Sequence, residues 1–250
     1  MRMAAKCGVD AVKFQKRTPD ICVPESQKYR TRSTPWGDIQ YIDYKRRMEF
    51  DNEQYGELTK EAARLGVDIY ASVWDMPAAQ FCKDIGFLTV KIPSAMVTNL
   101  ELLDYCKDNF DMRIISTGMS TEEQILTAIE HLDPHVVYHC CAAYPAQYED
   151  LNLMRIPYMC EHYEDCMIGY SGHETGLTTT ECAVALGARY IERHITLDRT
   201  MWGSDQAASV GPVGLERLVR GIRDIEKAFG SGGPRVIQDC EKDKLASLRG

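Results

Sequence analysis

The chain has 250 residues, of which 44% are hydrophobic and 26% charged, and its formal net charge is −8. These values are ordinary for a globular protein that buries a full core, and we predict one domain over residues 1–250. The acidic charge argues against a general nucleic-acid or membrane-surface binder, because either needs a clustered basic face. No stretch approaches the ~18 apolar residues of a membrane span, so a cytoplasmic protein is expected.

In chain order, short apolar runs alternate with amphipathic stretches. Seven strands are predicted, at residues 11–15, 67–72, 89–92, 113–117, 136–140, 167–170 and 189–194. Seven helices are predicted, at residues 52–65, 76–85, 99–110, 121–132, 151–162, 177–186 and 212–229. The run Ser120-Thr-Glu-Glu123 predicts a capping box with Ser120 as the cap, and Gly66 and Gly187 stand where helices should end.

Strict alternation of strand and helix indicates a parallel sheet, either open and doubly wound or closed into a barrel. No Gly-x-Gly-x-x-Gly follows an early strand, so the dinucleotide signature of an open sheet is missing. Nearly every strand ends in polar residues, which a barrel would bring together at one mouth. We therefore predict an α/β (β/α)8 TIM barrel. Residues 1–8 read as the second half of a helix, so we expect the first barrel strand to be missing from this chain.

Two lysines, Lys13 and Lys91, lie inside apolar strands, where an ammonium group is costly without an anion. Near them we expect four hydroxyls at strand ends, those of Ser72, Ser94, Ser116 and Ser171. Such a group would suit a phosphate and a carboxylate on one small ligand. The competing interpretation is a lysine near a strand end that extends its ammonium group to solvent, or a structural salt bridge between a lysine and Glu192.

Two histidines, His173 and His194, end neighbouring strands, and strands about 4.8 Å apart allow two imidazoles to share one ion. Glu192 is on the same strand face as His194. With oxygen ligands from Glu192, Asp205 or water, Mn, Mg, Co or Fe fits better than a closed zinc site. His139 stays open, since it would either line the mouth or pack in the core.

Other histidines and the cysteines are interpreted as structural or surface residues. The ten cysteines are scattered and form no C-x-x-C pair, which favours free thiols in the core over disulfides. Cys160, His162 and Cys166 have a zinc-like spacing but no second ligand pair nearby.

Several segments, in this order and at this spacing, resemble the sialic acid synthases, which use phosphoenolpyruvate to make N-acetylneuraminate and related nonulosonates. The segments are Gly8-Val-Asp-Ala-Val-Lys-Phe-Gln15, Lys91-Ile-Pro-Ser94, Ser116-Thr-Gly-Met119, Tyr144-Pro145, Gly169-Tyr-Ser-Gly-His173, Glu192-Arg-His194 and Gly203-Ser-Asp205. The resemblance implies condensation of phosphoenolpyruvate with an open-chain sugar aldehyde, such as that of N-acetylmannosamine, with release of phosphate.

The resemblance also implies residue roles. His173 and His194 would bind a divalent metal, with Mn or Mg favoured over Co or Fe. Phosphoenolpyruvate would be held by Lys13, Lys91, Ser72, Ser94, Ser116 and Ser171, and the sugar would face Gln15, Tyr144 and Asp205. As catalytic groups we predict Glu192, to orient or deprotonate a water, and Lys91, to stabilise the departing phosphate. A homodimer is a further expectation.

Some positions depart from the family pattern. Met96, Ala142 and Gly211 replace polar residues common in relatives, so the sugar site is expected to differ from one for N-acetylmannosamine. An antifreeze-like C-terminal domain is not expected in this chain. Selectivity would then come from barrel loops, above all the long connection between Cys22 and Arg47, which we predict to be a lid.

Two alternative functions are compatible with the sequence. One is an impaired relict, or a barrel fragment dependent on a partner, that binds ligand without turnover. The other is an octulosonate or heptulosonate phosphate synthase, which would need a second phosphate site. Arg113 and Arg189 begin their strands, and so they should lie at the opposite end of the barrel.

Overall fold

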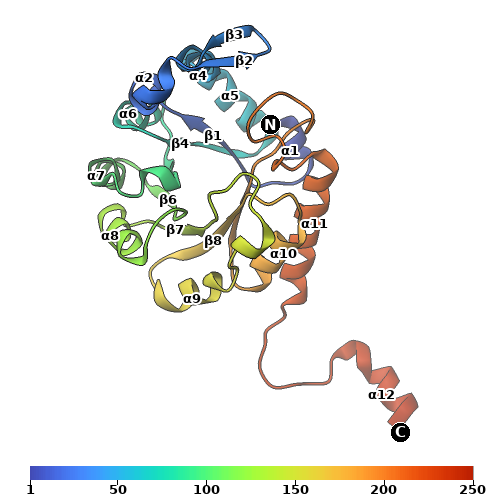
Figure 1. Cartoon of the computed structure of the whole chain (residues 1–250). Coiled ribbons are helices and arrows are strands. Elements are labelled where there is room, and N and C mark those ends of the chain that lie inside the picture. Colours follow the sequence, from blue (N-terminus) through green and yellow to red (C-terminus); the bar gives the residue numbers. More distant parts are fainter. Residues whose placement is uncertain (250) are drawn as a thin grey trace.

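A curled sheet of seven parallel strands forms the centre of the molecule, in a computed structural model that describes residues 1–249 (Figure 1). The strands lie side by side in chain order, with β1 and β9 at the two ends of the sheet. They are β1 (Ala11–Lys16), β4 (Asp68–Val73), β5 (Thr89–Ile92), β6 (Met112–Ser116), β7 (Val136–His139), β8 (Met167–Gly172) and β9 (Tyr190–Arg193). Every predicted strand is present, and the parallel α/β architecture is confirmed as a seven-stranded, half-barrel sheet.

Helices cover the outside of this sheet (Figure 1). They are α5 (Asn52–Leu65), α6 (Met76–Asp84), α7 (Leu100–Asn109), α8 (Glu122–Leu132), α9 (Arg155–His162), α10 (Thr178–Ala185) and α11 (Pro212–Ala228), with the short α1 (Arg2–Lys6) against α11. Within residues 1–249, none of the helices has both the length and the apolar character needed to cross a bilayer.

Capping explains several helix boundaries. α5 begins with a capping box between Asp51 and Gln54 and ends at Gly66, whose φ of 69° is left-handed. The predicted cap of α8 was wrong by one residue: Thr121 is the cap and pairs with Gln124 in the capping box. The Ser120 hydroxyl instead donates to the carbonyl oxygen of Gly118.

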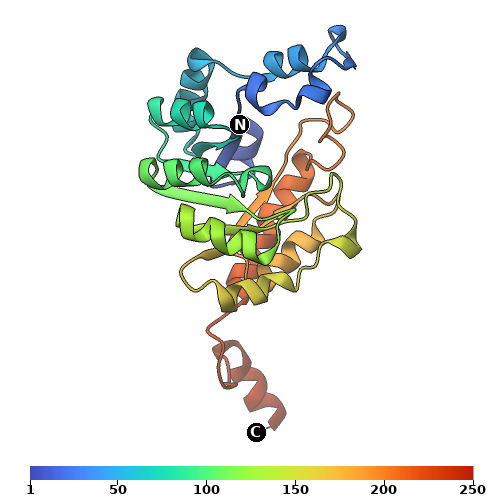
Figure 2. The same ribbon diagram turned by 60° about the vertical axis from the view of Figure 1, so that its left-hand side comes forward.

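The connection after β1 is folded rather than irregular. It contains α2 (Pro19–Cys22), α3 (Glu25–Lys28), the hairpin of β2 (Thr31–Thr34) with β3 (Gly37–Gln40), and α4 (Tyr41–Met48). Figure 2 shows these elements beside the loop that follows β9, on the same side of the molecule. We call residues 17–50 the lid segment.

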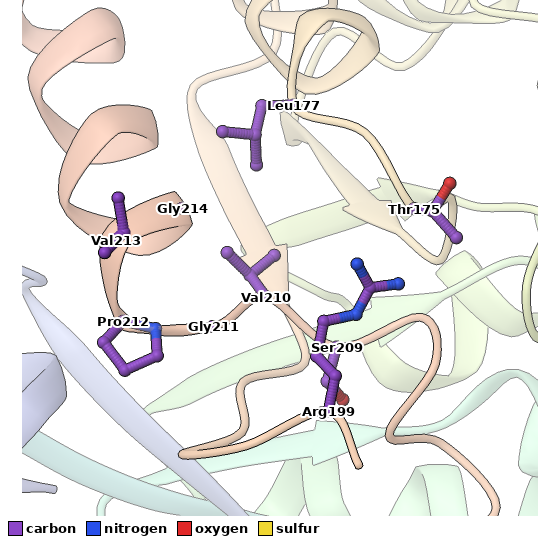
Figure 3. A pocket seen from close by; sticks show the side chains of 9 residues that line it. All are labelled: Thr175, Leu177, Arg199, Ser209, Val210, Gly211, Pro212, Val213 and Gly214. Atoms are coloured by element: carbon purple, nitrogen blue, oxygen red, sulfur yellow. The ribbon is translucent and has the colours of Figure 1, made fainter.

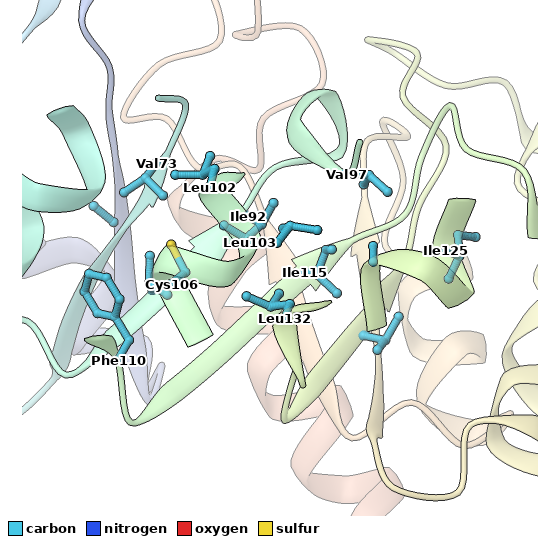
Figure 4. Packing of buried hydrophobic residues seen from close by; sticks show 14 of the residues in the cluster. Val73, Ile92, Val97, Leu102, Leu103, Cys106, Phe110, Ile115, Ile125 and Leu132 are labelled. Carbon is cyan, nitrogen blue, oxygen red and sulfur yellow. The ribbon is translucent and has the colours of Figure 1, made fainter. Parts of the chain in front are cut away.

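The main core lies between the sheet and the helices outside it. Side chains from β5, β6 and α7, among them Ile92, Ile115, Leu102 and Leu103, are almost completely buried (Figure 4). At roughly 1.5–3 kcal/mol for each large apolar side chain, this layer holds the helices on the sheet and fixes the direction of the strands. The opposite face of the strands is left to line the interior of the curl.

The C-terminal segment stands apart from this body. After α11 the chain continues to α12 (Lys242–Arg249), which has no buried side chain (Figure 1).

Candidate active site

One buried carboxylate oxygen in the sheet interior contacts side chains from three other strands. Glu192 Oε1, on β9, lies 2.9 Å from Lys13 Nζ on β1 and 2.5 Å from Lys91 Nζ on β5. It also accepts a 3.0 Å hydrogen bond from the Ser171 hydroxyl on β8. The structure thus brings together both predicted lysines, one predicted serine and the predicted base.

Two polar atoms in the interior lack partners. Glu192 Oε2 and Ser116 Oγ are buried without a hydrogen bond among the described residues. Because a buried polar atom without a partner is costly, such atoms point to a missing polar ligand. Ser72 is also buried, and its hydroxyl has only a long contact of 3.5 Å to the carbonyl oxygen of Phe14.

Charges in this cluster stabilise one another. Burial lowers the pKa of Lys13 to about 8. The negative charge of Glu192 opposes this shift, and the positive charge of Lys91 adds to it. Burial alone would raise the pKa of Glu192, but Lys13 and Lys91 overcome this effect and hold it well below its usual range. The carboxylate is therefore ionised and able to accept hydrogen bonds.

The two predicted metal ligands lie side by side at the ends of β8 and β9. The ring centroids of His173 and His194 are 5.4 Å apart, and Tyr144 packs against both, at 4.1 and 5.8 Å. His173 Nδ1 lies 2.7 Å from the carbonyl oxygen of Cys141, to which it donates, and this leaves Nε2 with a free lone pair. Asp205 Oδ2 lies 3.6 Å from His194 Nδ1.

This arrangement fits a divalent ion with open positions. A metal–nitrogen distance of about 2.1 Å allows two imidazoles at this spacing to share one ion. Burial lowers the pKa of His173, and burial together with Lys13 lowers that of His194 to about 4, so both rings are neutral as ligands must be. Within residues 1–249 no group of three or more His, Cys, Asp or Glu side chains is arranged around one point. The remaining ligands would have to be water or substrate oxygens.

The remaining predicted site residues are less directly connected to the cluster. Gln15 Oε1 accepts from Arg17 Nη2 at 2.5 Å. The Ser94 hydroxyl accepts from the backbone N–H of Gly118 at 3.0 Å and lies 3.3 Å from Cys140 Sγ. Ser94 therefore already has protein partners.

His139 packs in the protein: its Nε2 lies 2.7 Å from the carbonyl oxygen of Leu151, and its ring lies beside Tyr170. This settles the choice that the sequence left open.

Two residues near the site escaped the sequence reasoning. Arg17 continues the face of Lys13 and Gln15 beyond β1, and strand alternation would have indicated it. Tyr138 lies below Lys91, with the ring centroid 5.2 Å from Nζ. Its position in an apolar run made it look like an ordinary core residue.

A separate cavity of about 300 Å³ lies between the start of α11 and the loop after β9 (Figure 3). Arg199, Ser209 and Val210 line it together with Thr175, Leu177 and residues 211–214. None of the predicted site residues borders this cavity.

Known proteins are similar to this chain over almost its whole length. N-acetylneuraminate-9-phosphate synthase of Homo sapiens is 38% identical over 247 residues, which cover 96% of this chain and 68% of that protein. N,N'-diacetyllegionaminic acid synthase of Legionella pneumophila is 33% identical over 241 residues, which cover 92% and 67%.

A crystal structure of N-acetylneuraminic acid (sialic acid) synthetase from Leptospira borgpetersenii, in complex with citrate, superposes with a TM-score of 0.87 at 29% identity. The match covers 99% of this chain and 85% of that chain. The NeuB family model matches residues 1–233, which include every strand and every site residue described above. This chain belongs to the NeuB family.

Proposed function

We propose that this enzyme condenses phosphoenolpyruvate with the open-chain aldehyde of a sugar, giving a nonulosonate and inorganic phosphate. The observation that carries the proposal is the buried group of Lys13, Lys91 and Glu192. This group lies in the sheet interior, near the strand ends that carry the two histidines. Named relatives in the family are synthases of sialic, legionaminic and pseudaminic acids, which supports this reaction class. A closed eight-stranded barrel, a homodimer and a cytoplasmic location remain predictions.

Phosphoenolpyruvate would bind at the lysines. Its carboxylate and phosphate carry the negative charge that two buried ammonium groups require, and Ser72, Ser116 and Ser171 supply hydroxyl donors around them. Among residues 1–249, Ser116 Oγ has no hydrogen-bond partner, which fits a hydrogen bond to the substrate. Ser94 would act through its bond to the Gly118 backbone and Cys140.

The reaction forms one carbon–carbon bond and, from water, one carbon–oxygen bond, and it breaks the carbon–oxygen bond between C2 and the phosphate. C3 of the enol attacks the aldehyde carbon, and the aldehyde oxygen takes up a proton. Water adds to C2 and loses a proton, and we propose that Glu192 accepts this proton through Oε2. Phosphate then leaves from C2, and Lys91 and Lys13 stabilise its charge.

His173 and His194 would hold the divalent ion, Mn or Mg by preference and Co or Fe as alternatives. The chemistry that such an ion supplies is Lewis-acid polarisation of the aldehyde oxygen. Tyr144 packs against both rings, and Asp205 would orient His194 from its Nδ1 side. Gln15, Tyr144 and Asp205 would contact the sugar.

The test is acceptor-dependent release of phosphate from phosphoenolpyruvate in the presence of Mn²⁺. Mannosamine-type hexoses, 2,4-diacetamido hexoses, mannose and their 6-phosphates should be compared, since relatives in this family act on different acceptors. We expect phosphate release with at least one acceptor and none without an acceptor or after chelation. Failure of every acceptor to elicit phosphate would overturn the proposal for this chain.

A further inference from the structure

A second buried ion pair lies next to the histidine pair, behind the ends of β8 and β9. Glu174 Oε1 lies 3.2 Å from Arg193 Nη1, and the two side chains are 0% and 2% exposed. The same carboxylate accepts hydrogen bonds from the hydroxyls of Tyr170, Thr179 and Thr180, at 2.9, 2.9 and 2.8 Å. Both carboxylate oxygens therefore have fixed partners.

Arg193 also holds backbone. Its Nη2 donates to the carbonyl oxygen of Glu174 at 2.5 Å, and its Nη1 donates to the carbonyl oxygen of Gly176 at 2.8 Å. A side chain of β9 thus fixes the segment that follows β8. A guanidinium group is suited to this task because it holds five N–H donors in a rigid plane, whereas a lysine has three donors on a flexible stem.

The sequence neighbours of the two residues give this pair its significance. Glu174 follows His173 directly, and Arg193 precedes His194 directly. Adjacent residues of an extended strand point to opposite faces, so Arg193 points away from the interior that Glu192 faces. The pair therefore joins the backbone next to His173 to the backbone next to His194.

Several features show that the chain accommodates this pair at a cost. A Cβ at Gly172 would lie 2.8 Å from Glu174 Oε2, so the carboxylate occupies space that only glycine leaves open. Arg193 Nε is buried without a hydrogen-bond partner among the described residues. Since a buried ion pair can often be replaced by apolar residues without loss of stability, stability alone does not account for it.

We propose that Glu174 and Arg193 form a positioning pair that keeps the imidazoles of His173 and His194 at the separation needed to share one metal ion. This inference rests on the proposed function, in which that histidine pair binds the ion. Neither residue of the pair touches the ion or the substrate. Both act through the backbone that carries His173 and His194.

The principal test is Glu174→Gln, which retains the side-chain shape and removes the charge. The full-length protein would be titrated with Mn²⁺, following free Mn²⁺ by electron paramagnetic resonance, and with Co²⁺, following its visible absorption. We expect the Mn²⁺ dissociation constant to rise about tenfold, the usual effect of replacing a residue that supports a metal ligand. The Co²⁺ spectrum should also change. The KM for phosphoenolpyruvate should stay within about twofold, because Lys13 and Lys91 are untouched.

Thr180→Val provides a milder variant in case Glu174→Gln does not fold. Thr180 donates to Glu174 and accepts from Arg193 Nη1 at 2.7 Å, so valine removes two bonds and leaves the charges. Its Mn²⁺ affinity should fall by a smaller factor, and its Co²⁺ spectrum should shift in the same direction as that of Glu174→Gln.

Glu122→Gln is the matched control for a purely structural effect. Glu122 accepts from a guanidinium and a tyrosine hydroxyl, those of Arg155 and Tyr163, but on α8 and α9, away from the histidines. It should lower the melting temperature without changing Mn²⁺ affinity. If folded Glu174→Gln and Thr180→Val bind Mn²⁺ as tightly as the wild type, the inference is overturned alone. A wild-type protein that binds no Mn²⁺ would overturn the metal site of the proposed function as well.

Discussion

At the scale of single residues, Lys13 and Lys91 share one counter-ion before substrate binds. Both ammonium groups are compensated by one oxygen of Glu192, so the interior is charged but not unpaired. An incoming phosphoenolpyruvate competes with Glu192 for the same lysines. The site is therefore preorganised for an anion without the full penalty of two isolated buried cations.

Glu192→Gln separates the role of this carboxylate in catalysis from its role in holding the lysines. We expect kcat to fall by about 10²–10⁴, the range for a lost general base. The affinity for phosphoenolpyruvate should not weaken, because the lysines lose a competitor. The unfolding free energy should fall by roughly 3–5 kcal/mol, as when a buried pair is broken. Steady-state kinetics, substrate binding and chemical denaturation measure the three quantities, and an unchanged kcat would exclude the base role.

Alanine at His173 or His194 should abolish turnover and Mn²⁺ binding while the circular dichroism spectrum stays that of the wild type. The physical reason is that two protein ligands are available, and loss of either leaves a single imidazole. His162→Ala is the comparison, since His162 stacks on Tyr158 in α9, at 3.9 Å between centroids, far from the pair. Retained activity in either of the first two variants would remove the metal role from that histidine.

At the scale of elements, the lid segment is joined to the loop after β9 by aromatic contacts. Trp202 lies edge-on to Tyr44 of α4, at 5.1 Å, and 6.3 Å from Trp36 in the hairpin turn. The guanidinium of Arg32 lies 5.4 Å from the Trp202 ring centroid. The same loop carries Asp205. These contacts therefore join the lid segment to the loop that holds a predicted sugar contact.

Trp202→Ala should raise the KM for the acceptor sugar about tenfold and leave the KM for phosphoenolpyruvate unchanged. Loss of two aromatic pairs and one cation–π contact removes about 1–2 kcal/mol that holds the Asp205 loop in place. Phe229→Ala, an exposed aromatic at the end of α11, is the control and should change neither KM. An equal rise in both KM values would show that the loop does not act on the acceptor alone.

The strands and long helices could be predicted from sequence because their signals are local. Alternation and left-handed glycines such as Gly66 placed every strand and long helix to within about two residues, except the start of α9. The lid elements could not, since helices of four residues such as α2 and α3 present no apolar face. α9 begins at Arg155 rather than 151 because Asn152, with a φ of 44°, has a left-handed conformation that an α-helix does not accommodate.

At the scale of the whole molecule, the body and the C-terminal segment differ in what they bury. No side chain in α12 is buried, whereas α11 buries Leu215 and Leu218 against the body. Removal of the residues after Phe229 should therefore leave the melting temperature within about 2 °C, since exposed segments contribute little to stability. Calorimetry on the two lengths of chain tests this, and a drop of 5 °C or more would show an unexpected contact.

The site as a whole was only partly predictable. Residues at strand ends, such as Lys91 and His194, carry their signal in the strand itself. Glu174 and Arg193 do not: each reads as an ordinary surface charge beside a more conspicuous histidine, and only the folded chain shows them paired and buried. Long-range pairing of this kind depends on the curvature of the sheet, which no local pattern encodes.

The distance along the chain between the members of the buried cluster has a consequence for folding and synthesis. Glu192 lies 101 residues beyond Lys91, and its strand is the last of the sheet. Contacts so remote in sequence carry a large loop-closure entropy and form late. A ribosome-bound chain that has not yet released β9 would expose both lysines without their counter-ion. Pairing of both lysines with Glu192 is thus complete only after β9 has left the ribosome and joined the sheet.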